Sequence, residues 1–213
     1  MKMQPVQLAA WLLALSISDL AATSAVPGKA AFAASASPAA GNALAAGRPA
    51  AGPCERQMAL AAARHGVPLG MLYAIGLTET GRRHTLHPWA LNIEGRTVYA
   101  RSRRHALALY HQARRRGHRL IDLGCMQINV HYHGRQFRSV AEMLDPARNV
   151  DYAARFLKRL YRREGTWTMA AARYHAGPDN DAAQKRYVCT VIRNLVASGF
   201  GRWTPRARSF CRR

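Results

Sequence analysis

Acidic side chains and lysine are both scarce in this chain. Of its 213 residues, 11 are Asp or Glu and 32 are Lys or Arg, and only four of the basic residues are Lys. The formal net charge is therefore +21 at pH 7. So large an excess of positive charge favours an anionic partner, for which nucleic acid, anionic lipid and an anionic cell-wall polymer are the candidates. Composition alone does not choose among them.

Long apolar runs and internal repeats are also missing. No run reaches the roughly 20 apolar residues that a membrane-spanning helix needs, which excludes a polytopic membrane protein. No repeat of about 20–50 residues is visible, which excludes a solenoid. Hydrophobic residues make up 49% and charged residues 20% of the chain, so it is not disordered throughout. The length fits one folded domain with a tail at either end.

The N-terminal region has the pattern of a secretory signal. Lys2 precedes an apolar run over residues 8–17, and small residues follow. We predict a signal peptide over residues 1–33, with cleavage near Ala25 or Ala33, and export to the periplasm of a Gram-negative bacterium. A disordered leader that stays in the cytoplasm is the alternative. Residues 34–53, rich in Ala, Gly and Pro, are expected to form a flexible leader. We place the folded domain at 54–200 and an Arg-rich C-terminal tail at 201–213.

The chain has four cysteines, and none of them forms a Cys-x-x-Cys pair. An even number of cysteines in an exported chain favours disulfides over zinc. Three pairings are possible; we prefer Cys54 with Cys125 and Cys189 with Cys211, and free buried thiols are the alternative. His131 and His133 lie too close in sequence, without a nearby carboxylate or thiolate trio, to be good metal ligands. We expect no metal and no cofactor.

Hydrophobic periodicity and capping signals predict a mostly helical chain. The expected helices cover about 54–65, 68–80, 102–117, 145–165, 166–177 and a last segment ending before Gly199. Alternation around Glu94-Gly95 predicts a hairpin over 91–99. Residues 120–129 are interpreted as an extended or turning segment that leads into a short helix. The predicted fold class is therefore α+β, mostly α, with a small β element.

Glu79 is the most informative residue, because acids are scarce and this one continues the apolar stripe of the second helix, formed by Leu69, Leu72, Ile75 and Gly76. Burial raises the pKa of a carboxyl group because it disfavours the charged form. A carboxylic acid that keeps its proton near neutral pH can protonate a leaving oxygen, as cleavage of a glycosidic bond requires. The alternative is a Glu at the edge of the core, held by Arg82 or Arg83.

Four motifs in order resemble the lytic transglycosylase family, whose catalytic SLT domain is goose-lysozyme-like. They are Leu77-Thr78-Glu79-Thr80-Gly81, Gly124-Cys125-Met126-Gln127-Ile128-Asn129, Ala171-Ala172-Arg173-Tyr174-His175-Ala176-Gly177-Pro178 and Tyr187-Val188. The resemblance spans about 54–198 and is strongest to the small secreted members that accompany secretion machines. It implies a lysozyme-like single domain that cleaves peptidoglycan.

The resemblance also implies site residues. Glu79 would be the sole catalytic acid/base. The expected substrate-binding residues are Thr80, Met126, Gln127, Asn129, Tyr174, His175, Ala176, Gly177 and Tyr187, with Trp89 and Asn92 from a stretch that looks like a groove-wall insert. Two positions depart from the family pattern: His175 stands where Asn is usual, and Cys125 where an aliphatic residue is common. Asp122 is the best candidate for a second carboxylate, with a bracing role in the loop as its alternative.

A family with one catalytic carboxyl implies substrate assistance. The expected reaction cleaves the β-1,4 bond between N-acetylmuramic acid and N-acetylglucosamine and leaves a 1,6-anhydro end. A hydrolytic, lysozyme- or chitinase-like enzyme of the same fold is the alternative. A non-catalytic basic module that binds the wall or nucleic acid is the alternative from another class, although no helix-turn-helix, zinc-finger or RNA-binding motif is visible and nucleic acid is not expected. The expected partners are peptidoglycan glycan strands and an envelope-spanning secretion, conjugation or flagellar apparatus, and the expected state is a monomer.

Overall fold

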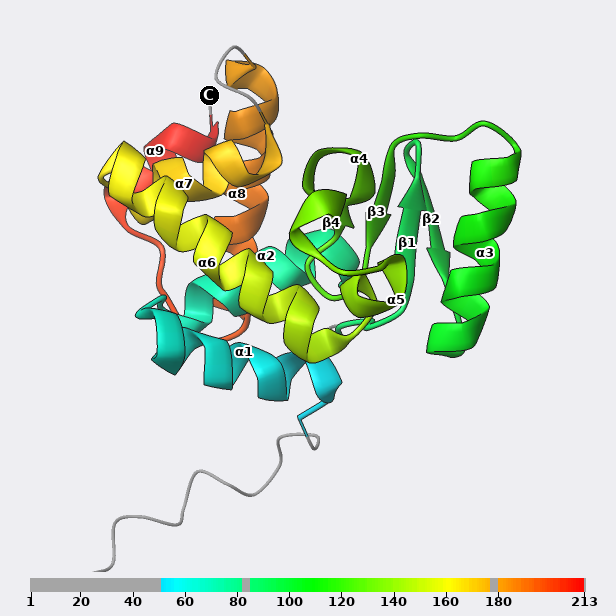
Figure 1. Cartoon of the computed structure of the whole chain (residues 1–213). Helices are drawn as coiled ribbons and strands as arrows, with labels where there is room; N and C mark the ends of the chain where they lie inside the picture. Colours follow the sequence, from blue (N-terminus) through cyan, green and yellow to red (C-terminus); the bar gives the residue numbers. More distant parts are fainter. Residues whose placement is uncertain (1–50, 82–84, 177–179, 213) are drawn as a thin grey trace, which may run out of the picture. The chain divides into compact units, whose positions relative to one another are not determined.

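A computed structural model describes residues 51–81, 85–176 and 180–212 (Figure 1). These residues form a mostly helical domain with one small antiparallel sheet, which confirms the predicted α+β class. The elements in chain order are α1 (Pro53–His65), α2 (Leu69–Thr80), β1 (Ala90–Ile93), β2 (Arg96–Tyr99), α3 (Arg103–Arg115), β3 (Ile121–Leu123), β4 (Ile128–Asn129), α4 (Val130–His133), the 3-10 turn η1 (Gly134–Gln136), α5 (Val140–Met143), α6 (Pro146–Glu164), α7 (Trp167–His175), α8 (Asp181–Ala197) and α9 (Pro205–Arg212).

The helix starts follow local capping chemistry. Ser102, Asp145 and Thr166 each accept a backbone N–H bond in the first turn of α3, α6 and α7, respectively. Side-chain caps of this kind satisfy donors that have no partner within the helix. Pro146 then occupies the first turn of α6, where its missing N–H costs nothing. These helices therefore begin where the sequence predicted.

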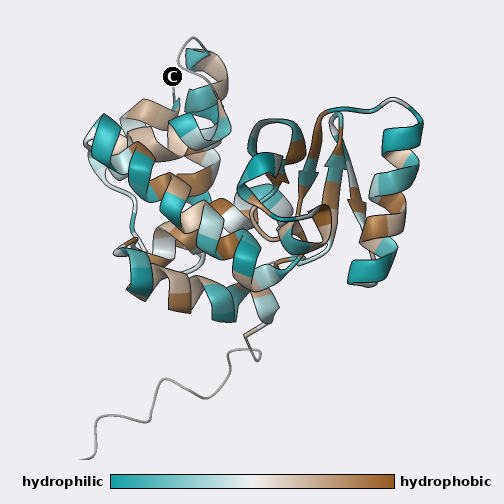
Figure 2. Cartoon of the chain, in the orientation of Figure 1, coloured by the Kyte–Doolittle hydropathy of each residue, from teal (hydrophilic) through white to brown (hydrophobic). Residues whose placement is uncertain are grey.

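The core lies where α2 meets its neighbours. α6 packs against α1 and α7, and α8 packs against α2 and α7. α1, α3 and α6 each carry hydrophilic and hydrophobic turns (Figure 2), as expected of helices with one exposed face. α2 differs, because its buried positions occur around most of its circumference: Gly70, Leu72, Ala74, Ile75, Gly76 and Thr80. The sequence predicted a single apolar stripe on this helix, but its buried surface is wider than one stripe. Glu79 therefore lies in the last turn of a helix that other elements enclose.

The sheet has strand order β2-β1-β3-β4. Glu94 and Gly95, both with positive φ, form the hairpin turn between β1 and β2 at the predicted position. Paired residues project to the same face of a sheet, so the register places Thr97, Asn92, Asp122 and Asn129 in one polar row. The opposite face holds the buried side chains of Leu91, Ile93, Ile121, Leu123 and Ile128.

Two features went beyond the sequence prediction. The segment 120–129 contributes β3 and β4 to the sheet before the short helix α4. Within the stretch predicted only as an Arg-rich tail, residues Pro205–Arg212 form α9. An isolated helix this short is marginal in water, so tertiary attachment must hold it. No helix in the described ranges is both long and apolar enough to cross a bilayer.

Both disulfides match the preferred pairing. Cys54 at the start of α1 is bonded to Cys125, which directly precedes Met126, and both cysteines are fully buried. Cys189 on α8 is bonded to Cys211 on α9. The first bridge anchors the loop of residues 124–127, which we call the Met-Gln loop after Met126 and Gln127, to α1. The second bridge attaches α9 to the rest of the domain.

Candidate functional site

Glu79 lies in the last turn of α2 and remains partly accessible to solvent. The hydroxyl of Tyr187, on α8, donates a hydrogen bond to its Oε1 atom at 2.6 Å. Among the described residues, the other carboxyl oxygen, Oε2, has no hydrogen-bond partner. Thus Tyr187 holds Oε1 in place, whereas Oε2 is available to bind or release a proton. The alternative contact with Arg82 or Arg83 falls on residues outside the described ranges.

Burial raises the pKa of Glu79 from 4.5 to about 7. The Tyr187 hydrogen bond acts in the opposite direction, because it stabilises the carboxylate. The negative charge of Asp122 adds to the increase. A Glu with this pKa holds its proton on a substantial fraction of molecules at neutral pH and releases it within the same range, as a group acting in turn as acid and base requires.

Tyr174 and Tyr187 complete the surroundings of the carboxyl. Burial, followed by the charge of Glu79, raises the pKa of both phenols well above 10. Both therefore stay protonated and act as hydrogen-bond donors. The Tyr174 hydroxyl donates to the carbonyl oxygen of Met126 at 2.8 Å, which joins α7 to the Met-Gln loop. The structure thus brings the predicted residues Glu79, Tyr174, Tyr187 and Met126 together.

The Met-Gln loop depends on Asn149, a residue that sequence reasoning missed. The fully buried Asn149 side chain accepts a bond from the Met126 N–H at 2.9 Å and donates to the carbonyls of Leu123 and Met143. Gly124 has a φ of +80°, and a Cβ there would lie 2.6 Å from the Asn149 amide nitrogen. One signal was present: Asn149 is polar at a core-facing position of the α6 pattern, four residues before Ala153.

Two other predicted residues make bonds within the protein. The Nε2 atom of Gln127, a residue with positive φ, donates to the carbonyls of Ala90 and Gly124. Its buried Oε1 has no hydrogen-bond partner among the described residues. Thr80 is buried, and its hydroxyl lies 3.2 Å from the Gly76 carbonyl and 3.3 Å from that of Cys125. Thr80 thereby ties the end of α2 to the Met-Gln loop.

The end of α7 contributes His175, whose imidazole stacks on the Tyr187 ring with centroids 4.2 Å apart and planes 6° apart. Desolvation, followed by the charge of Arg186, lowers the pKa of His175, so the ring is mainly neutral at pH 7. His175 therefore supports the phenol that bonds Glu79. Ala176 ends α7, with its N–H donating to Ala172. Gly177 lies outside the described residues.

The sheet carries the remaining predicted residues. The Asn129 amide donates to Asp122 at 2.7 Å, and its carbonyl oxygen caps α4. Burial raises the pKa of Asp122, whereas the Asn129 bond lowers it. The negative charge of Asp122 raises the pKa of both Glu79 and Tyr174, which places this carboxylate near the site. Asn92 instead accepts the N–H of Gly95 in the hairpin turn.

Trp89 and the histidine pair lie in different settings. Trp89 precedes β1, packs partly against the core, and accepts the Ala100 N–H through its carbonyl. His131 is exposed, whereas Nδ1 of His133 lies 2.8 Å from the Tyr152 hydroxyl. Among the described residues, no group of three His, Cys, Asp or Glu side chains is placed to hold a metal ion.

A family model described as transglycosylase SLT domain matches residues 58–195. The matched stretch contains Glu79, the Met-Gln loop, Asn149 and both tyrosines, and it covers more than half of the chain. α9, which carries Cys211, lies beyond it, whereas Cys189, the disulfide partner of Cys211, lies within it. No curated protein and no solved structure matches the chain.

Proposed function

Because the chain belongs to the transglycosylase SLT domain family, we propose that it cleaves the β-1,4 bond between N-acetylmuramic acid and N-acetylglucosamine with Glu79 as its only acid/base. Family membership itself indicates peptidoglycan degradation of the lytic transglycosylase type. The assignment of Glu79 is supported by its pKa of about 7 and by the Tyr187 bond to Oε1. The observation that carries the proposal is the position of the Glu79 carboxyl, which is enclosed at the end of α2 and bonded to the Tyr187 hydroxyl.

The first step needs a proton donor. Protonated Glu79 transfers its proton to the glycosidic oxygen, and the bond from that oxygen to the anomeric carbon of N-acetylmuramic acid breaks. The N-acetyl carbonyl oxygen of the same sugar attacks the anomeric carbon and spreads the positive charge. This assistance replaces the second carboxylate that most glycosidases use as nucleophile or as base.

The second step needs a base. Glu79, now a carboxylate stabilised by the Tyr187 hydroxyl, takes the proton of the C6 hydroxyl of the same sugar. The C6 oxygen attacks the anomeric carbon, displaces the acetamido oxygen and closes the 1,6-anhydro ring. Because this hydroxyl is already attached to the reacting sugar, its effective concentration exceeds that of water. Glu79 regains its proton, and no water is consumed.

Asp122 favours one alternative, a hydrolase of the same fold. Its carboxylate lies close enough to raise the pKa of Glu79, and Asn129 holds it in place. A second carboxylate near the acid is what an enzyme needs to activate water. Hydrolysis would add a water to the product, so its muropeptides would be heavier by 18 Da, the mass of water, than the anhydro products.

The two disulfides support export as part of the proposal. Disulfides persist in oxidising compartments such as the periplasm and are rare in the cytosol. Cys54 and Cys125 are fully buried and bonded next to the Met-Gln loop, so an oxidised state is built into the site. We propose that the protein acts in the periplasm on glycan strands, as a monomer serving an envelope-spanning apparatus.

Digestion of purified sacculi, followed by mass spectrometry, tests the proposal. The wild-type protein is expected to release 1,6-anhydro muropeptides. Glu79→Gln, which keeps the size and polarity of the side chain, is expected to reduce release by about 10²–10⁴-fold or more, the contribution typical of a general acid/base. Products with an added water would favour the hydrolase. Unchanged release by Glu79→Gln would contradict the role of this carboxyl, and a wild-type protein that binds sacculi without releasing products would indicate a non-catalytic module.

A further inference from the structure

The region around α3 carries a concentration of positive charge that the proposed reaction does not use. Residues 96–120, which comprise β2, α3 and the segment that follows α3, contain no Asp or Glu. They contain eight Arg, which include Arg103 and Arg104 in the first turn of α3 and Arg114–Arg116 at its end. A quarter of the 32 basic residues of the chain thus falls in a stretch that supplies no negative charge.

The periodicity of α3 separates its buried side from its charged side. One face of the helix is buried, at the three- and four-residue spacing of a helix face: Ala106, Tyr110 and Ala113. The opposite face is exposed at the same spacing, and we call it the basic stripe: Arg104, Ala108, His111 and Arg115. Arg104 and Arg115 lie at the two ends of the stripe, about 16 Å apart at 1.5 Å per residue. The small side chain of Ala108 between them allows a flat surface to approach the helix closely.

The guanidinium groups of the basic stripe have no acid partner. Among the described residues, no ion pair or hydrogen bond involves the guanidinium group of Arg104 or Arg115. Glu94, the acid that precedes this stretch, lies 2.8 Å from Nδ1 of His118 and accepts the backbone N–H of Arg119. The charge of the stripe is therefore uncompensated by the protein and accessible to an anion from solvent.

α3 belongs to a different part of the domain from the elements that carry the Glu79 site. It packs mainly against β1 and α5, and the Arg103 guanidinium donates to the Ala141 carbonyl of α5 at 3.0 Å. The catalytic groups instead lie on α2, α7 and α8, and α8 packs against the other two. In Figure 1, α3 lies at one edge of the domain, beyond the sheet. A surface that contacts the stripe can therefore leave the Glu79 site uncovered.

The chemistry of the stripe suits phosphate groups that are arranged in a plane. A guanidinium donates two parallel hydrogen bonds to phosphate oxygens and is less strongly hydrated than an ammonium. Leu120, which directly follows Arg119, is 44% exposed. Basic and apolar side chains occur together where a protein lies at the boundary between lipid headgroups and acyl chains. The exposed Leu120 thus favours a lipid surface over a hydrated polymer such as glycan or nucleic acid.

We propose that the basic stripe of α3 binds the phosphate groups of an anionic phospholipid surface. Arg104 and Arg115 contact the headgroups, and Leu120 enters the boundary with the acyl chains beside them. Each basic residue near such a surface strengthens binding by about fivefold. This contact holds the domain at a membrane with α2, α7 and α8 free to bind another molecule. It does not depend on the proposed reaction.

Sedimentation of the full-length protein with vesicles tests the proposal. One set of vesicles consists of phosphatidylcholine, and the other is a mixture of phosphatidylcholine with phosphatidylglycerol. The wild-type protein is expected to prefer the mixed vesicles, and Arg104→Ala/Arg115→Ala should weaken that binding by about 25-fold, or fivefold for each Arg. Alanine favours the helix, so α3 should stay folded. Every variant keeps the apolar run over residues 8–17, so any binding by that run is the same in each.

A matched control separates the stripe from general electrostatic attraction. Arg202→Ala/Arg206→Ala removes the same charge from exposed residues before and within α9, which lies on the other side of the view from α3 (Figure 1). This control is expected to keep most of the binding to the mixed vesicles. Arg104→Lys/Arg115→Lys, which retains the charge, should also keep most of it. Equal losses for the control and for Arg104→Ala/Arg115→Ala would overturn the proposal.

Leu120→Ser distinguishes lipid from other polyanions. It should weaken binding to the mixed vesicles by several-fold, because less apolar surface leaves water, and leave binding to duplex DNA and to purified sacculi unchanged. Unchanged vesicle binding by Leu120→Ser would contradict the insertion of this side chain. The lipid assignment would also be wrong if the wild-type protein bound sacculi or duplex DNA more tightly than the mixed vesicles and the arginine variant lost that binding. None of these measurements requires release of muropeptides, so they can fail or succeed independently of the proposed reaction.

Discussion

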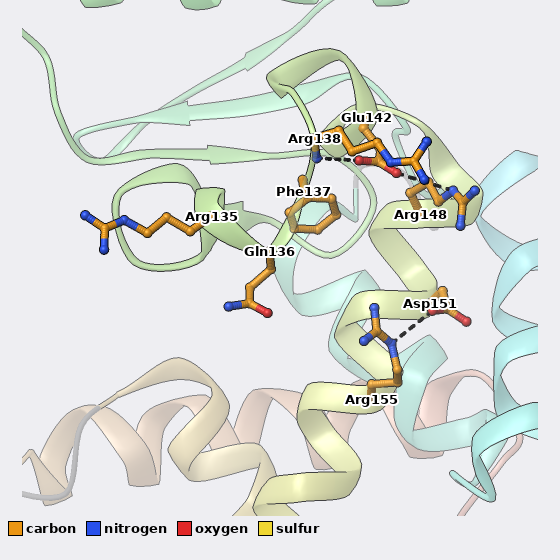
Figure 3. A pocket seen from close by; sticks show the side chains of 8 residues that line it. All are labelled: Arg135, Gln136, Phe137, Arg138, Glu142, Arg148, Asp151 and Arg155. Carbon is orange, nitrogen blue, oxygen red and sulfur yellow. Dashed lines mark hydrogen bonds and ion pairs between the residues drawn. The ribbon is translucent and has the colours of Figure 1, made fainter.

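The Glu79 site differs in its electrostatics from the arginine cavity, a cavity between η1, α5 and α6 whose lining includes Arg135, Arg138, Arg148 and Arg155 (Figure 3). Around Glu79, burial raises the pKa and the neighbours are phenols, a stacked imidazole and backbone groups. In the cavity, Arg135 and Arg138 are exposed and have no acid partner among the described residues. Burial therefore favours the protonated form of the Glu79 carboxyl in the first region, whereas the arginines of the second region keep their charge exposed to water. The Tyr174 ring contacts Phe156 on α6, and Phe137, which lines the cavity, contacts Tyr152 on the same helix.

This difference shows how a strongly basic chain can hold a neutral carboxyl. A guanidinium close to Glu79 would lower its pKa and remove the proton that catalysis needs. Asp122 instead raises the pKa of Glu79, and Asp122 itself accepts a hydrogen bond from the neutral amide of Asn129. Among the described residues, no arginine or lysine is a cause of the pKa shift of Glu79.

The enclosed region should tolerate side-chain changes far less than the exposed one. Gly124→Ala places a Cβ 2.6 Å from the buried Asn149 amide at a φ of +80°. We expect the free energy of unfolding to fall by about 3–5 kcal/mol, the upper range for strain and disrupted buried hydrogen bonds. Urea denaturation measures the loss.

Gly117→Ala is the matched control for that change. Gly117 has a φ of +86°, but a Cβ there has no atom within 4 Å. It should cost only the roughly 1–2 kcal/mol of the left-handed backbone conformation. Equal losses for the two variants would show that contact between Gly124 and Asn149 does not support the Met-Gln loop.

The Tyr187 hydrogen bond should matter to the rate and to its pH dependence. Tyr187→Phe removes the donor to Glu79, so kcat is expected to fall by about 10–100-fold, as for the loss of a bond to a charged group. Because this bond lowers the pKa of Glu79, its loss should move the alkaline limb of the pH–rate profile to higher pH. Tyr161→Phe, on α6 and stacked on Trp167, is the control that should change neither. A limb that moves to lower pH would refute the assigned role.

The dependence of KM and kcat on salt concentration is the smallest of the expected effects, and it should differ between the two regions. Exposed charges are screened at high ionic strength, whereas a desolvated carboxyl is not. Raising the salt concentration from about 0.05 to 0.5 M should therefore raise KM on peptidoglycan strands by several-fold and leave kcat nearly constant. A salt-independent KM would deny the arginines a role in binding, and a kcat that fell with salt would place charge attraction in the chemical step.

The sequence predicted the parts of the site that depend on local signals. Glu79 stood out because an acid followed an apolar helix, and Asp145-Pro146 marked the start of α6. Asn149 could not be assigned because its three bonds join residues 23 and 26 positions away in the chain, as well as Met143. The β3–β4 pairing and α9 were missed for a similar reason: both segments are too short to be stable without tertiary contacts or a disulfide.

The proton on Glu79 is measured most directly by following its side-chain carboxyl carbon by NMR as the pH is varied, with Glu79→Gln used to identify the signal. The account predicts a midpoint near 7. Because the pKa in the folded state exceeds that of the unfolded chain, the stability that this group contributes is present below about pH 4.5 and is lost as the pH rises through about 7. A midpoint at 4.5, the value of an ordinary glutamate, would contradict the claim that burial keeps this acid protonated.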